Sequence, residues 1–163
     1  DDYGRTWNPI FDSAPTGSVG DIAVSPTSPN IIYVGTGEGL HRPDLGVGDG
    51  MFKSTDGGKT WLQIGLTDVQ QVGRVIVHPT NPEVVIVAAL GHPYGANETR
   101  GVFRTKDGGK TWGEVIHLRD DGACSDLGYP RSIQRADGTI VTTYYFNEHV
   151  DTERCIAATL WRP

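Results

Sequence analysis

Three charged side chains stand at equivalent positions of a sequence pattern that recurs along the chain, and they are the first candidates for chemistry. They are Asp21, Arg74 and Arg131. Two arginines on the inner strands of a sheet protein can grip a carboxylate through paired hydrogen bonds. An acidic sugar is therefore a candidate ligand. A solvated charge or a local ion pair is the competing interpretation, because charged side chains are mostly exposed.

Histidines in long polar loops form a second group of candidates. His41, His92 and His149 each follow an apolar run and precede the next one. Their spacing matches no zinc motif, so no metal is expected, and His92 is retained as a substrate-binding candidate. The sequence also lacks a phosphate-binding loop, a dinucleotide fingerprint and a Gly-x-Ser-x-Gly motif, so no cofactor is expected.

A sequence motif of eight residues, called the phrase below, recurs along the chain. Residues 54–61 read Ser-Thr-Asp-Gly-Gly-Lys-Thr-Trp, residues 105–112 nearly repeat them, and residues 2–7 form a partial third copy. In each copy Asp can cap backbone N–H groups, Gly accepts positive φ, and Trp covers a hairpin. The phrase residues are therefore expected to be structural: Asp2, Gly4, Trp7, Asp56, Gly58, Trp61, Asp107, Gly109 and Trp112.

Short β-branched runs bounded by Gly, Pro and Asn predict strands, and no stretch has a sustained helical period. A unit of four strands is expected at 20–25, 31–35, 51–54 and 60–65, and a second at 73–78, 84–89, 102–105 and 111–118. A third unit has strands at 127–134, 140–146 and 154–161, with a hairpin turn at 136–139. Its missing fourth strand is expected at residues 7–11, after the partial phrase.

The phrase on four-stranded units resembles the Asp-box, or bacterial neuraminidase, repeat of sialidase-like β-propellers. Residues 19–118 are similar to repeats of sortilin-like and related glycoside-hydrolase propellers, and residues 127–162 resemble a closing sialidase-type blade. The resemblance implies an all-β propeller and a secreted or periplasmic location. It also implies that Tyr145 and Glu148 form a catalytic pair like the Tyr–Glu nucleophile of sialidases. Packing between blades is the competing role of Tyr145.

The chain is expected to form one propeller domain of three four-stranded antiparallel blades. Residues 1–12 supply the outer strand of the last blade, 13–66 and 67–118 are complete blades, and 119–163 supply three strands of the last blade. Three blades are too few to close a ring, since propellers have 4–8. Two copies would give six, so a homodimer closed head to tail is the expected assembly. The competing interpretation is a fragment of a longer propeller.

The expected function is that of a sialidase-like module of glycoside-hydrolase type, which binds carbohydrate and hydrolyses it if Tyr145 and Glu148 act together. The alternatives are a non-catalytic protein-interaction propeller and a truncated propeller without activity. The chain has no Arg-Ile-Pro motif, so a complete sialidase site within one chain is not expected. Its net charge of −6 argues against nucleic acid as a partner.

No signal peptide and no apolar run long enough to span a bilayer are found in the sequence, so no membrane partner is expected. The two cysteines, Cys124 and Cys155, are expected near the starts of the first and third strands of one unit. Such strands lie roughly 10 Å apart. A disulfide needs Cα atoms within about 7 Å, which favours free thiols unless the loop before residue 127 folds over.

Overall fold

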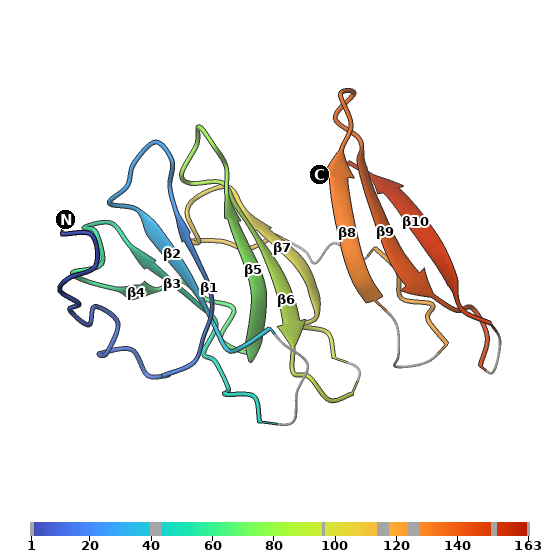
Figure 1. The fold of residues 1–163 in the computed structure, drawn as a ribbon, viewed down its shortest axis with the longest axis horizontal. Coiled ribbons are helices and arrows are strands. Elements are labelled where there is room, and N and C mark those ends of the chain that lie inside the picture. The colour runs from blue at the N-terminus through green and yellow to red at the C-terminus, as the bar shows by residue number, and fades with distance from the viewer. Residues whose placement is uncertain are drawn as a thin grey trace. The chain divides into compact units, whose positions relative to one another are not determined.

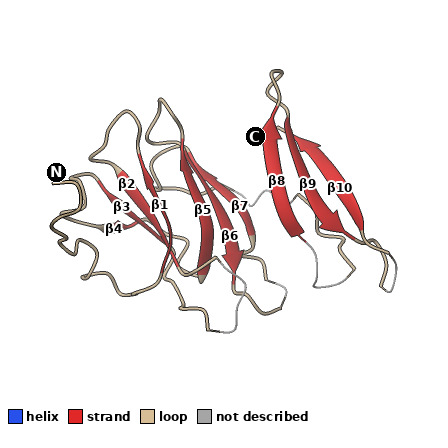
Figure 2. Cartoon of the chain, in the orientation of Figure 1, coloured by secondary structure: helices blue, strands red, loops and turns tan. Residues whose placement is uncertain are grey.

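The computed structural model describes residues 2–39, 44–95, 97–113, 118–123, 128–150 and 153–162. Within these ranges every regular element is a strand, which confirms the all-β prediction (Figure 2). The chain divides into two compact units, Asp1–Ile116 and His117–Pro163, and each is described by itself (Figure 1). Among the described residues there is no apolar helix of membrane-spanning length.

The first unit contains two antiparallel sheets. Sheet 1 has the order β1-β2-β3-β4, and its strands span Val19–Val24, Ile32–Thr36, Met51–Ser54 and Leu62–Gln63. Sheet 2 has the order β5-β6-β7, with strands Gln71–Val77, Val85–Gly91 and Gly101–Thr105. The two sheets repeat one register, since Val24 pairs with Ile32 in sheet 1 and Val77 pairs with Val85 in sheet 2.

The hydrophobic core of this unit lies between the two sheets. Tyr33 and Met51 of sheet 1 are fully buried against a row of valines on β5 and β6 of sheet 2. Gly35 permits the close approach, because a Cβ at that position would lie 2.4 Å from Cγ1 of Val72. The hydroxyl of Tyr33 donates a hydrogen bond of 2.9 Å to the carbonyl of Pro82. Burial of these apolar side chains is the main force that holds sheet 1 on sheet 2.

Each complete phrase folds into the turn expected of it. In the first copy the Asp56 carboxylate accepts bonds from the hydroxyls of Thr60 at 2.7 Å and Ser54 at 2.8 Å, and from the backbone N–H of Thr60 at 2.9 Å. These donors, led by the Thr60 hydroxyl, lower the pKa of Asp56 to about 2. Asp107 lies in the same arrangement with Thr111, which lowers its pKa as well.

The tryptophan that ends each complete phrase contacts an earlier part of the chain. Trp112 Nε1 donates to the carbonyl of Ile64 at 2.7 Å, and Trp61 Nε1 donates to the carbonyl of Ile10 at 2.5 Å. Ile64 lies three residues after Trp61, and Ile10 lies three residues after Trp7. Residues 7–11 therefore lie beside sheet 1 as the end of β4 lies beside sheet 2.

The fourth strands differ from their prediction. Residues 7–11 form no strand. They pair with none of the strands β1–β7, and Pro9 has no backbone N–H to donate to a neighbouring strand. The fourth strand of sheet 1 is shortened to two residues, Leu62–Gln63. In sheet 2, residues 111–113 are not a strand, and 114–117 of the predicted strand 111–118 lie outside the described residues.

The second unit is a single antiparallel sheet, sheet 3, of order β10-β9-β8. Its strands β8, β9 and β10 span Gly128–Gln134, Ile140–Phe146 and Cys155–Trp161, close to their predicted ranges. One face carries the buried Tyr144 and Phe146, with the Arg119 guanidinium 4.0 Å from the Phe146 ring centroid. Cys155 is a free, exposed thiol, and Cys124 lies outside the described residues.

Candidate functional site

Asp21 and Arg74, predicted as binding residues, meet across the inner strands of sheets 1 and 2. The Asp21 carboxylate accepts the backbone N–H of Val75 at 2.7 Å and lies 3.7 Å from Nε of Arg74. The Asp21 side chain is 19% exposed and the Arg74 side chain 70% exposed. Asp21 and Arg74 therefore form a local ion pair, and the exposed terminal amino groups of Arg74 make no hydrogen bond among the described residues.

His92 lies at the start of the loop that follows β6. Its Nδ1 lies 2.8 Å from the carbonyl of Tyr94, so the ring donates there and keeps Nε2 for another partner. Arg100 closes the loop by donating to the carbonyls of Leu90 at 3.0 Å, His92 at 2.9 Å and Gly95 at 3.2 Å. The sequence did not predict that Arg100 closes this loop through hydrogen bonds. The only indication was its position at the end of a loop bounded by glycines.

His92 and Arg74 lie on one sheet but not side by side. β5 pairs with β6 so that Gln71 faces Gly91, and Arg74 lies three residues further along β5. Three residues of a strand span roughly 10 Å. The two side chains are therefore not neighbours on the sheet.

The other three predicted residues lie in sheet 3. Arg131 is exposed on β8 and faces Thr143 of β9. Tyr145 is half-buried on β9, with the Arg154 guanidinium 5.7 Å from its ring centroid, and Glu148 is exposed beyond the end of the strand. Because successive strand residues point to opposite faces, Tyr145 shares a face with Thr143 and not with Tyr144.

Gln71 is a polar residue that sequence reasoning missed. Its side chain is fully buried at the start of β5, and its Oε1 has no hydrogen-bond partner among the described residues. The loop after β2 packs against this place, with Gly37 accepting the N–H of Val72 at 3.1 Å. A buried amide oxygen without a partner is uncommon and marks a position where a bound water or ligand donor would be stabilised.

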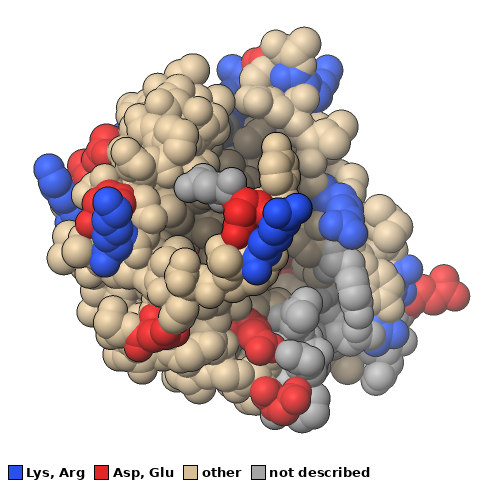
Figure 3. All heavy atoms as spheres, turned by 60° about the vertical axis from the view of Figure 1, so that its left-hand side comes forward, with Lys and Arg blue, Asp and Glu red and all other residues tan. Residues whose placement is uncertain are grey.

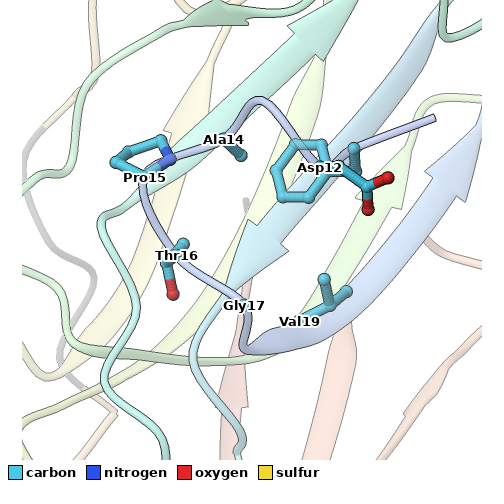
Figure 4. A pocket seen from close by; sticks show the side chains of 7 residues that line it. Asp12, Ala14, Pro15, Thr16, Gly17 and Val19 are labelled. Atoms are coloured by element: carbon cyan, nitrogen blue, oxygen red, sulfur yellow. The ribbon is translucent and has the colours of Figure 1, made fainter. Parts of the chain in front are cut away.

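A hollow of about 410 Å³ lies at residues 11–19, where an open loop runs into β1 (Figure 4). Its polar groups include Asp12 and Thr16, and the Thr16 hydroxyl is already bonded to the carbonyl of Val47 at 2.9 Å. None of the predicted binding residues lines it. We therefore assign the hollow no role in gripping an anionic ligand.

Charges of both signs are scattered over the face shown in Figure 3, and the Lys and Arg side chains form no continuous basic patch there. No group of three His, Cys, Asp or Glu side chains that could hold a metal ion occurs in the described part of the chain. His41, one of the three loop histidines, lies outside that part.

Comparison with known proteins identifies the family. Residues 1–159 match the model of the Sortilin-Vps10 family, described as sortilin, neurotensin receptor 3. The chain belongs to this family. The Sortilin-Vps10 match supports a β-propeller and the sortilin-like part of the predicted resemblance. No curated protein matches the sequence significantly.

Solved structures similar to this Sortilin-Vps10 chain include two GH74 enzymes. An ancestral GH74 enzyme is 19% identical, with a TM-score of 0.55 over 94% of this chain and 20% of its own. The GH74 enzyme of Niastella koreensis is 20% identical, with a TM-score of 0.46 over 84% of this chain and 19% of its own. A protein of unknown function from Dyadobacter fermentans is 24% identical, with a TM-score of 0.48 over 98% of this chain and 43% of its own.

These likenesses bear on the fold of the Sortilin-Vps10 chain. The first, with its TM-score of 0.55, supports the propeller arrangement of antiparallel sheets. The chain spans about a fifth of that enzyme's length. The three sheets of 3–4 strands are accordingly part of a propeller.

Proposed function

We propose that this chain is a propeller module of glycoside-hydrolase type that binds carbohydrate bearing an acidic group. Two copies, each with three sheets, form a six-bladed ring, and the inner strands line its channel. Arg74 grips the acidic group, Asp21 lies beside Arg74, and His92 contacts another part of the sugar. Arg131 of sheet 3 is a second candidate for binding an acidic group. The likeness to an ancestral GH74 enzyme supports the glycoside-related reading.

The observation that carries this proposal is the pairing of Asp21 with Arg74. Asp21 approaches the guanidinium at Nε, at 3.7 Å, and leaves the two terminal amino groups directed to solvent. The rest of this exposed guanidinium can donate two parallel hydrogen bonds to a carboxylate.

Binding is tested on a glycan array that carries sialylated, uronate-bearing and neutral glycans. The native chain is expected to retain acidic glycans, and Arg74→Gln to bind them at least tenfold more weakly, because a hydrogen bond to a charged group contributes about 1.5–3 kcal/mol. Arg135→Gln removes an exposed arginine from the β8–β9 turn and is the matched control. Equal binding by Arg74→Gln and the native chain would refute the assigned role of Arg74.

Hydrolysis is a separate part of the proposal. Tyr145 would be the nucleophile and Glu148 its activating base. Turnover of a fluorogenic sialoside by the native chain, lost in Tyr145→Phe and in Glu148→Gln, is the expected result. Glycan binding without turnover would leave a lectin-like module and remove the catalytic assignment.

A non-catalytic protein-interaction propeller is the second candidate, and the family match favours it because the family description names a receptor. In that case the long loops after β2, β6 and β9 would contact a protein partner, as loops on a rigid scaffold commonly do. If the native chain binds no glycan on the array but binds a defined protein ligand, protein interaction is favoured over carbohydrate binding.

A further inference from the structure

The loop between β6 and β7 is closed by its last residue, Arg100. Nε of Arg100 donates to the carbonyl of Leu90 at 3.0 Å. Nη2 donates to the carbonyls of His92 at 2.9 Å and Gly95 at 3.2 Å. Because the guanidinium is planar and carries its donors in a fixed geometry, this one side chain sets the spacing of three carbonyls.

Asn97 binds two of the same carbonyls. Its Nδ2 donates to His92 at 3.1 Å and to Gly95 at 3.4 Å, and its Oδ1 accepts the hydroxyl of Thr99 at 2.9 Å. A Cβ at Gly91 would lie 1.9 Å from Oδ1, so the Asn97 amide packs directly on the backbone where the loop begins. The backbone at His92 is therefore held by hydrogen bonds from two side chains.

This backbone determines which ring nitrogen of His92 carries the proton. Nδ1 lies 2.8 Å from the carbonyl oxygen of Tyr94, and a carbonyl oxygen can only accept a hydrogen bond. Nδ1 is therefore the donor. In a neutral ring the other nitrogen, Nε2, is then a hydrogen-bond acceptor.

His78 shows that the local backbone, and not the residue type, makes this choice. Its Nδ1 accepts the backbone N–H groups of Thr80 and Asn81, each at 3.2 Å. The neutral ring of His78 therefore carries its proton on Nε2, the opposite of His92. Two histidines of one chain thus have opposite tautomers because one ring lies beside a carbonyl and the other beside N–H groups.

We propose that Arg100 is a positioning residue for carbohydrate binding, which holds His92 so that Nε2 accepts a hydrogen bond from a sugar hydroxyl. The inference rests on the carbohydrate binding proposed above and assigns the group that His92 recognises. His92 is half-buried, and its Nε2 has no hydrogen-bond partner in the part of the chain that the structure describes. A hydroxyl suits this acceptor because it donates through O–H, whereas a carboxylate offers only acceptors.

The acceptor role distinguishes the contact of His92 from that of Arg74. A guanidinium only donates, so Arg74 binds the acidic group, and the neutral His92 ring binds a hydroxyl of the same glycan through Nε2. A site that hydrogen-bonds a hydroxyl rejects an analogue without it, because a polar group of the site then loses its partner. One particular deoxy glycan is therefore expected to bind weakly.

Nuclear magnetic resonance tests the role of Arg100 without any ligand. In alkaline buffer, where histidine side chains are neutral, the chemical shifts of the ring nitrogens report which one carries the proton. The native chain is expected to have the proton on Nδ1 of His92 and on Nε2 of His78, which serves as the internal reference. Arg100→Gln is expected to give a mixture of both tautomers at His92 and to leave His78 unchanged.

Two further variants serve as controls for this measurement. Arg100→Lys keeps the charge but replaces the planar fork by one ammonium group, and it is expected to give the same mixture of tautomers. Arg135→Gln removes an exposed arginine from the β8–β9 turn and is expected to leave both histidines as in the native chain. Native folding of each variant is checked by circular dichroism and thermal unfolding.

Calorimetric titration with sialyllactose and its single-deoxy analogues tests the contact with the sugar. The native chain is expected to bind one deoxy analogue about three- to tenfold more weakly than sialyllactose, as for the loss of one hydrogen bond. His92→Phe is expected to bind this analogue and sialyllactose equally. Arg100→Gln is expected to bind sialyllactose more weakly and to lose most of the difference, because the two residues act on one contact.

Each result decides a separate point. A native His92 with its proton on Nε2, or a native tautomer in Arg100→Gln, overturns the positioning role. If Arg74→Gln loses sialyllactose binding while the native chain binds every deoxy analogue as well as the parent, the hydroxyl contact is overturned and carbohydrate binding stands. A native chain that binds no glycan overturns both the proposed function and the sugar as the partner of His92.

Discussion

Two faces of the same unit have nearly the same sequence pattern and opposite environments. The β5–β6 face is buried beneath sheet 1, and the β1–β2 face is open beside residues 10 and 11. Both present β-branched side chains at the same strand positions. The repeat therefore encodes which face of a sheet is apolar, whereas burial of that face depends on whether another sheet covers it.

The covered face between sheets 1 and 2 is expected to be the more sensitive to substitution. Tyr33→Ala removes a fully buried ring from the contact between the sheets. It is expected to lower the free energy of unfolding by about 3–5 kcal/mol, the usual cost of deleting a buried aromatic ring. Ile22→Ala on the open face is expected to cost about 1 kcal/mol or less in dilute, monomeric protein. Urea unfolding measures both, and equal losses would contradict the assignment of the two faces.

Gly35→Ala tests how closely sheets 1 and 2 are packed. The added Cβ would lie 2.4 Å from Cγ1 of Val72, so one sheet must move. The expected loss of unfolding free energy is about 1–3 kcal/mol. Gly17→Ala is the control, since no atom lies within 4 Å of its added Cβ. A neutral Gly35→Ala would mean that the sheets are less closely packed than described.

Tyr33→Phe separates the polar part of the covered contact from its apolar part. The ring stays, and the 2.9 Å hydrogen bond to the carbonyl of Pro82 is lost. Burial raises the pKa of Tyr33, so its hydroxyl remains a donor throughout the neutral range. The expected cost is about 1 kcal/mol in urea unfolding. A loss as large as that of Tyr33→Ala would show that the hydrogen bond, and not the ring, dominates the contact.

Acid unfolding gives the smallest expected effect. The pKa of Asp56 is lowered to about 2 by its hydrogen bonds, first that of Thr60, so the carboxylate stabilises the folded state above its ordinary pKa of 3.8. That contribution is lost as the pH falls from about 4 through 2. The Tm of the native chain should fall over this range, and that of Asp56→Asn should fall less. Asp68→Asn, an exposed carboxylate, should behave as the native chain does.

Much of the fold follows from local sequence. Turn residues and β-branched runs located the strands of all three sheets, because hydrogen-bonding Asp, positive-φ Gly and alternating apolar residues act over a few neighbouring positions. The short fourth strands were not predicted. Trp7, Ile10 and Phe11 favour a strand, whereas Pro9 disfavours one, and a strand also needs a partner strand that the local sequence does not specify.

The candidate site was less predictable from the sequence, because its contacts join residues that are far apart in the chain. The contact between Asp21 and Arg74 joins residues 53 positions apart, and only their equivalent places in the repeat pointed to it. The burial of Gln71 and the loop-closing bonds of Arg100 arise from tertiary packing that composition does not reveal. Roles for Arg131, Tyr145 and Glu148 remain predictions.

The indole bonds of the repeated phrase also set an order of events during synthesis on the ribosome. Each indole donates to a carbonyl made earlier, 51 residues before Trp61 and 48 residues before Trp112. Because synthesis proceeds at about 5–20 residues per second, roughly 3–10 s pass between the synthesis of the acceptor residue and that of the tryptophan that binds it. The growing chain therefore carries one unfastened outer segment at a time, and a nascent chain halted before Trp61 would expose that segment to other chains.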